Sequence, residues 1–457
     1  MKINWRKTGK VITVVAVAVA LILTLLVAPI DRTPLQQQGF YQEMMQHLES
    51  LQLNHAKGDE VSVGWSKLSI IPDHPVPLAG YRPRPDFTGV NDSLYVRVTS
   101  IDNGKRTVFI ISADLLLFPP VLKDMLVQKV TNDNYFLYFS ASHTHTSVGG
   151  WDPSMLGRIL MGTYDQAWME SLASQIMASL ERARTTARKA TIAYWERDAS
   201  WYVYNRLHRQ APEDGWLRGL KVTRDDSSTA ILAAFSAHPT LIARKKTLLS
   251  GDYPGALVRH LESEVNHCQF LGGMIGSHRI EGMKRSDYDF ADRVGDILAH
   301  QALEADPIPL AGEANFVLGK VEVAFGPSQM RLTDNLKLRN WAFDQVVGPL
   351  EGEITILGIG NLLLLGMPCD FSGEIASAEG LQQLANNHDM ELIITSFNGD
   401  YNGYITADRH YDKSRNEEVR ALNWVGPYFG DYFGKIAKML IVKVAEQHDH
   451  KTTEPNP

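Results

Sequence analysis

Two histidines separated by one residue, His143 and His145, are the residues whose type and spacing point most directly to chemistry. They follow an apolar run typical of a strand and precede the pair Gly149-Gly150, so both imidazoles can face the same way. Neutral imidazole is a preferred zinc ligand, and it also titrates near neutral pH. The pair therefore predicts a metal site or an acid–base site, with a packing or surface role as the structural alternative.

Three other side chains with suitable chemistry stand at the ends of predicted strands. His238 follows an apolar run and precedes Pro239, which ends the strand ladder there. Asp370 follows a second apolar run, and Tyr404 follows a third. Loops at strand ends are where α/β proteins gather functional groups, so these residues are candidates for the same site as the histidine pair.

The elements that must position these side chains alternate between strands and helices. Apolar, β-rich runs predict strands at 61–65, 94–99, 107–112, 134–140, 220–223, 230–237, 268–274, 314–324, 354–366 and 392–396. Helical patterns are predicted at 121–130, 164–185, 254–265, 287–305 and 372–386, with one or two helices over 417–447. This alternation predicts a single α/β domain, residues 60–447, with a mixed β-sheet flanked by helices.

The N-terminus predicts one transmembrane helix. Four basic residues within 1–10 precede an uncharged apolar run, 11–30, which is about the length of a helix that crosses the hydrocarbon core. The charge distribution predicts a single-pass membrane protein with residues 1–10 in the cytoplasm and the body on the extracytoplasmic side, periplasmic or extracellular. A cleaved signal peptide is the alternative, although Pro29 fits a cleavage site poorly. Residues 31–59 are expected to form a stalk and 448–457 a disordered tail.

Composition and missing motifs exclude several classes of protein. The 457 residues are 44% hydrophobic and 21% charged, which is typical of a globular protein with a large core. A net charge of −7 without a basic stripe argues against a nucleic-acid partner. The sequence has no Gly-x-Ser-x-Gly, no His-Glu-x-x-His and no phosphate-binding glycine loop, which argues against a serine hydrolase, a zincin or a nucleotide enzyme. Cys268 and Cys369 form no CxxC pair, so a thiolate zinc site is excluded, and whether they form a disulfide stays open.

Five short segments together resemble the catalytic domain of the neutral/alkaline (non-lysosomal) ceramidases, zinc-dependent amidases that cleave the N-acyl bond of ceramide. In chain order they are His143-Thr144-His145, Asn205-Arg206, His238-Pro239, Pro368-Cys369-Asp370-Phe371 and Tyr401-Asn402-Gly403-Tyr404-Ile405-Thr406. Each segment alone is a weak signal, but five in the right order over about residues 60–440 are fairly specific.

The resemblance implies a role for seven residues. It implies His143, His238, Asp370 and Tyr404 as Zn²⁺ ligands, His145 as a proton-carrying acid/base, Arg206 as the group that holds the substrate carbonyl or oxyanion, and Ser277 as a weaker catalytic candidate. Apart from the family, two imidazoles, a carboxylate and an open position are the usual composition of a catalytic zinc site. Such a metal lowers the pKa of bound water and polarises a carbonyl. A neighbouring imidazole then protonates the leaving amine, and a cation stabilises the developing oxyanion.

The sequence also departs from the family pattern. Asp370 stands where the family has a glutamate, which is one methylene longer, so Glu374 is an alternative ligand. A Gly-Asp-x-Ser/Asn-Pro loop of the family is replaced by the segment 270–279, which leaves Ser277 as its candidate. A further tyrosine of the family falls at Asn416, and the family's C-terminal immunoglobulin-like domain is expected to be absent.

The sequence therefore predicts a membrane-anchored, zinc-dependent amidohydrolase that cleaves an N-acyl amide bond in ceramide or a related lipid. The alternative is a catalytically lapsed ceramidase-like protein that binds a lipid or protein partner, because Asp370 and the loop 276–279 depart from the family. A metal-dependent hydrolase of another ester or amide is a third interpretation.

Overall fold

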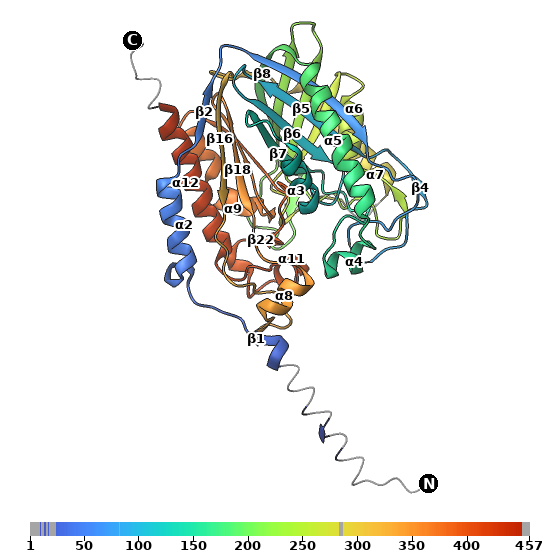
Figure 1. The fold of residues 1–457 in the computed structure, drawn as a ribbon, viewed down its shortest axis with the longest axis vertical. Helices are drawn as coiled ribbons and strands as arrows, with labels where there is room; N and C mark the ends of the chain where they lie inside the picture. Colours follow the sequence, from blue (N-terminus) through green and yellow to red (C-terminus); the bar gives the residue numbers. More distant parts are fainter. Residues whose placement is uncertain are drawn as a thin grey trace.

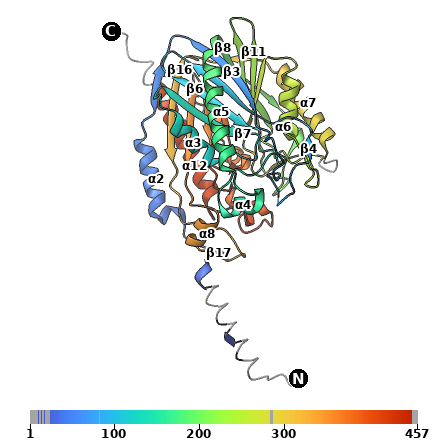
Figure 2. The same ribbon diagram turned by 45° about the vertical axis from the view of Figure 1, so that its right-hand side comes forward.

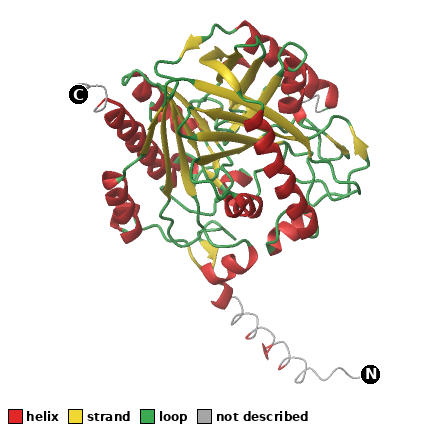
Figure 3. Ribbon diagram, turned by 45° about the horizontal axis from the view of Figure 1, so that its top comes forward, coloured by secondary structure: helices red, strands yellow, loops and turns green. Residues whose placement is uncertain are grey.

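Two β-sheets face each other at the centre of the molecule, and helices cover their outer faces (Figures 1 and 3). The computed structural model describes residues 10, 13–14, 17, 24–81, 83–282 and 287–449. Side chains from both sheets, among them Ile110, Leu220 and Leu364, form a shared buried core between the layers. The predicted mixed α/β architecture, with a mixed sheet flanked by helices, is confirmed.

The larger sheet, counted over the described residues, has nine strands and carries the histidine pair at the end of one of them. Its main path runs through β13 (His267–Gly272), β11 (Thr229–Phe235), β10 (Trp216–Arg224), β8 (Arg188–Asp198), β3 (Val61–Ser69), β5 (Tyr95–Asp102), β6 (Thr107–Ala113) and β7 (Tyr135–Ala141), and β15 (Ile308–Pro309) pairs with β8. The pairs β11–β13 and β6–β7 are parallel, and the others are antiparallel.

This sheet curls until the strands at its two ends lie against each other. The backbone N–H of Gly272, at the end of β13, donates to Ser140 Oγ in β7 at 3.1 Å. The buried side chain of Gln269 donates to the carbonyl of Ile110 in β6 at 3.0 Å and accepts a hydrogen bond from Thr99 in β5 at 2.7 Å. The curl therefore brings the loop after β7 close to the loop after β11, although these strands are far apart in sheet order.

The smaller sheet has five strands in the described part of the chain and supports the other wall of the site. In order they are β2 (Asn54–Lys57), β16 (Asn315–Glu322), β18 (Glu353–Ile359), β19 (Leu362–Gly366) and β21 (Glu391–Thr395), and only β19–β21 is parallel among these pairs. The single run predicted at 354–366 is a hairpin, because Gly360 adopts a left-handed turn with φ of 56°.

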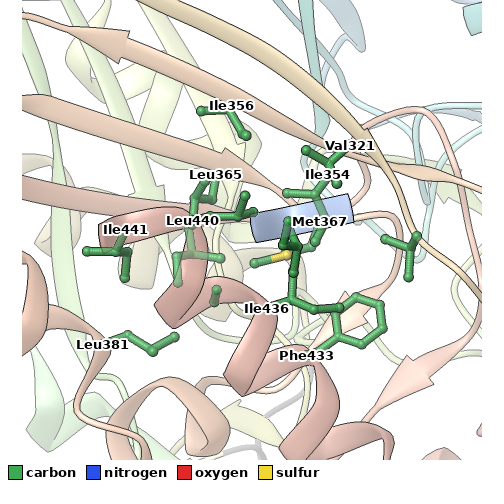
Figure 4. Close-up of a cluster of buried hydrophobic side chains, with 14 of the residues drawn as sticks. Val321, Ile354, Ile356, Leu365, Met367, Leu381, Phe433, Ile436, Leu440 and Ile441 are labelled. Atoms are coloured by element: carbon green, nitrogen blue, oxygen red, sulfur yellow. The ribbon is translucent and has the colours of Figure 1, made fainter. Parts of the chain in front are cut away.

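Helices cover the outer face of each sheet. The larger sheet is covered by α3 (Pro120–Lys129), α5 (Gln166–Thr185), α6 (Asp252–Leu261) and α7 (Tyr288–Glu304), and the smaller by α2 (Gly39–Ser50), α9 (Gly373–Ala378), α10 (Leu381–Asn386) and α12 (Phe429–Asp449). In α12, Phe433, Ile436 and Leu440 lie on one helical face and pack on Ile354 and Leu365 (Figure 4). The helix predicted at 372–386 is two helices, because Gly380 between them is left-handed.

The segment 31–59, expected to form a stalk, packs against the body instead. Tyr41, Met44 and Leu48 of α2 are buried in the same core as α12, and residues 54–57 are the edge strand β2. Their spacing of three and four residues gives α2 an apolar stripe, which the body covers.

The predicted transmembrane span, 11–30, lies partly outside the described residues. Among the residues that are described, no helix combines the length and the apolar character needed to cross a membrane. The end of the predicted span needs correction: β1 (Val27–Pro29) pairs antiparallel with β17 (Leu336–Leu338), and Ile30 is buried. Residues 27–29 belong to the body because their backbone pairs with the strand β17. Most of the predicted tail, from residue 450 on, lies outside the described residues.

Candidate metal centre

The four residues predicted as metal ligands come from four strand ends and meet at one point. His143 lies just after β7, and His238 lies just after β11. Asp370 and Tyr404 are register partners in a short parallel pair, β20 (Asp370–Phe371) and β22 (Tyr404–Ile405). All four are buried.

The distances between their donor atoms suit a small metal ion. Asp370 Oδ2 lies 3.5 Å from His143 Nε2 and 3.4 Å from His238 Nε2. Tyr404 Oη lies 2.8 Å from His238 Nε2. Zinc ligands at about 2.0–2.1 Å in a tetrahedral arrangement are roughly 3.3–3.5 Å from one another. The carboxylate and the two imidazoles already have this spacing, so the aspartate reaches despite its shorter side chain.

Asp370 supplies the clearest evidence that the site fits a cation. Both carboxylate oxygens are buried, and neither has a hydrogen-bond partner in the described part of the chain. Burial raises the pKa of Asp370, while His143, Arg206 and the nearby hydroxyl of Tyr404 oppose this rise. An ionised carboxylate without a partner is costly to bury, and a metal ion is one of the groups that satisfies it. The donor set therefore fits a divalent metal.

The hydrogen bonds of His143 and His238 leave the correct nitrogen free. His143 Nδ1 lies 2.5 Å from the carbonyl of Leu116, and His238 Nδ1 lies 3.0 Å from that of Ile275. A carbonyl only accepts, so each Nδ1 carries the proton and each Nε2 presents its lone pair to the cluster. Burial lowers the pKa of His143 to about 4 and that of His238 well below its usual value, so both rings are neutral. Metal-binding histidines in proteins typically have this arrangement.

His145 has the opposite tautomer. The backbone N–H of Tyr81 donates to His145 Nδ1 at 3.3 Å, so the neutral ring carries its proton on Nε2. That Nε2 lies 3.3 Å from His143 Nε2. One ring nitrogen from each of His143, His145 and His238 lies within 4.8 Å of the others, so the distances also allow a metal site with three histidine ligands. The hydrogen bond from Tyr81 leaves the proton of His145 on Nε2. This arrangement favours His145 as a proton donor beside the metal rather than as a third imidazole ligand.

Two residues of the site have a left-handed backbone. His143 has φ of 62° and Ser277 has φ of 68°. This conformation is uncommon outside glycine, costs of order 1–3 kcal/mol and is concentrated at functional sites. The ring of His143 stacks on Phe397, with ring centroids 4.4 Å apart, and this packing stabilises the strained backbone conformation.

Arg206 and Ser277 belong to one hydrogen-bonded network beside the histidines. Arg206 Nε donates to Glu418 Oε2 at 2.6 Å, and its Nη2 lies 3.3 Å from His238 Nε2. Ser277 Oγ donates to Glu418 Oε1 at 2.9 Å and accepts from Ser372 Oγ at 2.8 Å. Glu418 therefore fixes the guanidinium and the serine together. Nothing in the local sequence indicated this role, because Glu418 lies in a charged stretch that predicts a solvated helix face.

Glu374, the alternative ligand, is engaged elsewhere, and this interpretation is corrected. Its carboxylate accepts hydrogen bonds from Asn205 Nδ2 at 2.6 Å, Arg409 Nε at 2.5 Å and His410 Nε2 at 2.8 Å. Asn416, at the position of a family tyrosine, caps α11 (Glu417–Arg420) by accepting the N–H of Glu418. Cys268 and Cys369 are both buried and free, without a disulfide in the described part of the chain.

A cavity of about 810 Å³ lies behind the aromatic wall of the cluster. Tyr401 and Trp424 line it, with their rings 5.5 Å apart. The Tyr401 ring is 6.2 Å from that of Phe397, which stacks on His143. The rings of Tyr401 and Phe397 therefore separate the cavity from His143 of the candidate metal centre.

Fold and donor set together define a mixed α/β protein with a candidate catalytic metal centre. Residues 72–278 match the family model described as neutral/alkaline non-lysosomal ceramidase, N-terminal. The resemblance inferred from the five motifs is thereby confirmed. His143, Arg206, His238 and Ser277 lie inside the matched residues.

Two solved structures share the fold. One is the neutral ceramidase from Pseudomonas aeruginosa, with a TM-score of 0.72 and 16% identity, covering 85% of this chain and 75% of that chain. The other is described as a ceramidase complexed with C2, with a TM-score of 0.67 and 16% identity, covering 85% of this chain and 76% of that chain. The shared fold extends over the smaller sheet, beyond the residues of the family match.

Proposed function

We propose that this protein is a metal-dependent amidohydrolase that cleaves the N-acyl amide bond of ceramide or a related lipid. The observation that carries the proposal is the unpartnered, buried carboxylate of Asp370 between the Nε2 atoms of His143 and His238. The family match over residues 72–278 supports the reaction class. A donor set of imidazole, carboxylate and phenol supports zinc as the metal, since Asp370 stands at tetrahedral spacing from both imidazoles.

The proposed mechanism assigns a separate task to each group. His143, His238, Asp370 and Tyr404 would hold the metal, whose chemistry is to activate water and polarise the amide carbonyl. His145 directs its Nε2–H toward the cluster, where it would relay to the leaving amine nitrogen, as the C–N bond breaks, the proton that the attacking water gives up. Arg206, fixed by Glu418, places positive charge where the carbonyl oxygen becomes negative. Ser277 supports Arg206 through the same carboxylate.

The alternative of a lapsed, ligand-binding protein rests on the shorter side chain of Asp370 and on the loop 276–279, which departs from the family pattern. Strand β20 carries Asp370 at the register position of Tyr404, so its carboxylate lies within 3.5 Å of both imidazoles. This placement supports an active enzyme. The extracytoplasmic location inferred from the N-terminal charges stays a prediction.

The purified full-length chain is expected to contain about one zinc ion and to release fatty acid from ceramide. Elemental analysis gives the metal content, and mass spectrometry of the released acid gives the activity. A chelator should abolish activity, and added zinc should restore it. A protein that binds no metal after reconstitution contradicts the metal centre, whereas a metal-loaded protein that releases no fatty acid contradicts the substrate class alone.

Gly80 is expected to control the position of His145. Its φ is +93°, and a Cβ built there would lie 2.6 Å from His145 Cα. Gly80→Ala should therefore displace His145 and lower kcat by roughly 10- to 100-fold, because a 1 Å misplacement of a catalytic group has effects of that order. The measurement is kcat together with the melting temperature.

Gly104→Ala is the matched control for this variant. Gly104 has φ of +80°, but a Cβ there would meet no described atom within 4 Å. Both variants carry the left-handed backbone cost of about 1–2 kcal/mol, and only Gly80→Ala crowds His145. Equal kcat values for the two variants would show that Gly80 does not position the histidine.

A further inference from the structure

One end of the molecule presents exposed apolar side chains from two neighbouring helices. Met155 and Ile159 of α4 (Met155–Met161) are 56% and 54% exposed, and Trp341 of α8 (Asn340–Val346) is 55% exposed. Met155 and Ile159 are four residues apart and share one helix face. The two helices lie side by side (Figure 2). We call Met155, Ile159 and Trp341 the α4–α8 face, and such contiguous apolar surface marks an interaction site.

The 810 Å³ cavity lies beside this face. Pro153 and Ser154, which precede α4, and Val347 and Pro349, which follow α8, line the cavity. Its inner wall includes Tyr401, which leads through Phe397 to His143. A molecule that enters between the two helices is therefore directed toward the candidate metal centre.

The N-terminal segment joins the body at the same place. Trp341 Nε1 donates to the carbonyl of Leu25 at 3.2 Å, and Arg339 Nε donates to that of Thr24 at 3.1 Å. The sequence before them, 11–23, contains no charged residue. A stretch of that composition favours lipid over water.

We propose that the α4–α8 face docks on a lipid bilayer, with the cavity beside the bilayer surface. Trp341 suits this location because tryptophan favours the membrane–water interface. Carboxylates line the cavity, among them Asp124, Asp152 and Glu351, and the basic lining residue Lys123 is already paired with Asp400 at 2.7 Å. An anionic surface would be repelled by this charge, so the bilayer is zwitterionic.

The test places a polarity-sensitive fluorophore on the full-length chain through Ile159→Cys, since Cys268 and Cys369 are buried and do not compete for the label. Ile308→Cys is the matched control, because Ile308 is 43% exposed in β15, which pairs with β8 toward the other end of the molecule (Figure 1). With phosphatidylcholine vesicles, the label at 159 should shift to shorter wavelength, brighten several-fold and be quenched by nitroxide-labelled lipid. The label at 308 should not change.

The proposal is overturned if the label at 159 behaves like that at 308 while the chain co-sediments with vesicles, or if the chain does not co-sediment. It is also overturned if the label at 159 shifts with protein concentration in the absence of vesicles, which would assign the face to a second copy of the chain. Met155→Cys provides a second label position if Ile159→Cys does not fold. Hydrolysis of a short-chain, water-soluble amide is measured separately, so failure of docking is distinguishable from failure of the proposed activity.

Discussion

His238→Ala is expected to remove the bound metal and to reduce kcat/KM by roughly 10³-fold or more. Loss of one imidazole leaves the donor set incomplete, and metal catalysis supplies several kcal/mol of transition-state stabilisation. Each 1.36 kcal/mol corresponds to a factor of ten in rate. The zinc content measured by elemental analysis should fall from about one ion per chain toward zero. Added zinc should raise the melting temperature of the wild type but not of the variant, because only a state that binds the ion is stabilised by it.

His267→Ala is the control for the loss of any buried histidine. His267 lies at the start of β13, is 2% exposed and stacks on Trp65 with centroids 5.9 Å apart, away from the cluster. This variant should lose stability but keep its metal. If His238→Ala retains one zinc ion per chain, or if His267→Ala loses it equally, the proposed ligand set is wrong.

His145→Gln is expected to keep the metal and to lower kcat by about 10²- to 10⁴-fold, the usual contribution of a general acid or base. Glutamine retains a polar side chain but carries no titratable proton. The effect should fall on kcat, with little change in KM, because the proton is needed only as the amide bond breaks. Steady-state kinetics on metal-loaded protein measures this separation.

The metal content of His145→Gln also decides between two assignments of the histidine cluster. The hydrogen bond from Tyr81 to His145 Nδ1 indicates a proton donor, whereas proximity alone allows a three-histidine ligand set. Retained zinc with low kcat supports the proton carrier. Zinc lost to the same extent as in His238→Ala would show that His145 is a ligand and that the division of roles is incorrect.

The sequence could predict the parts of this site that depend on local pattern. Two apolar runs, one followed by Gly149-Gly150 and the other by Pro239, indicated strands that end just before His143 and His238. The structure has β7 and β11 at these places. Side-chain type limited the possible chemistry to imidazole, carboxylate and phenol donors. Motif order along the chain was enough to indicate the resemblance to the ceramidase family, and the family match over residues 72–278 confirms that resemblance.

Local hydrophobicity was a poorer guide at the N-terminus. The same apolar run is compatible with a cover of lipid or of protein, whereas in the structure residues 27–29 pair with β17 and Ile30 is buried. The stripe of Tyr41, Met44 and Leu48 is likewise a local pattern, but only the position of α12 shows that it is buried. The partners in both cases lie hundreds of residues away along the chain.

By itself, the sequence determined which side chains stand at strand ends and what chemistry they offer. Only the tertiary structure decided which of them meet. The curl of the larger sheet brings β13 against β7. The pairing of β20 with β22 places Asp370 beside Tyr404. The hydrogen bonds of Glu374 with Asn205 and His410 hold its carboxylate away from the site. The tautomer of His145 depends on Tyr81, and the position of Arg206 depends on Glu418. The physical reason is that residue type is a local property, whereas donor distances, proton positions and burial arise from long-range packing and strand register.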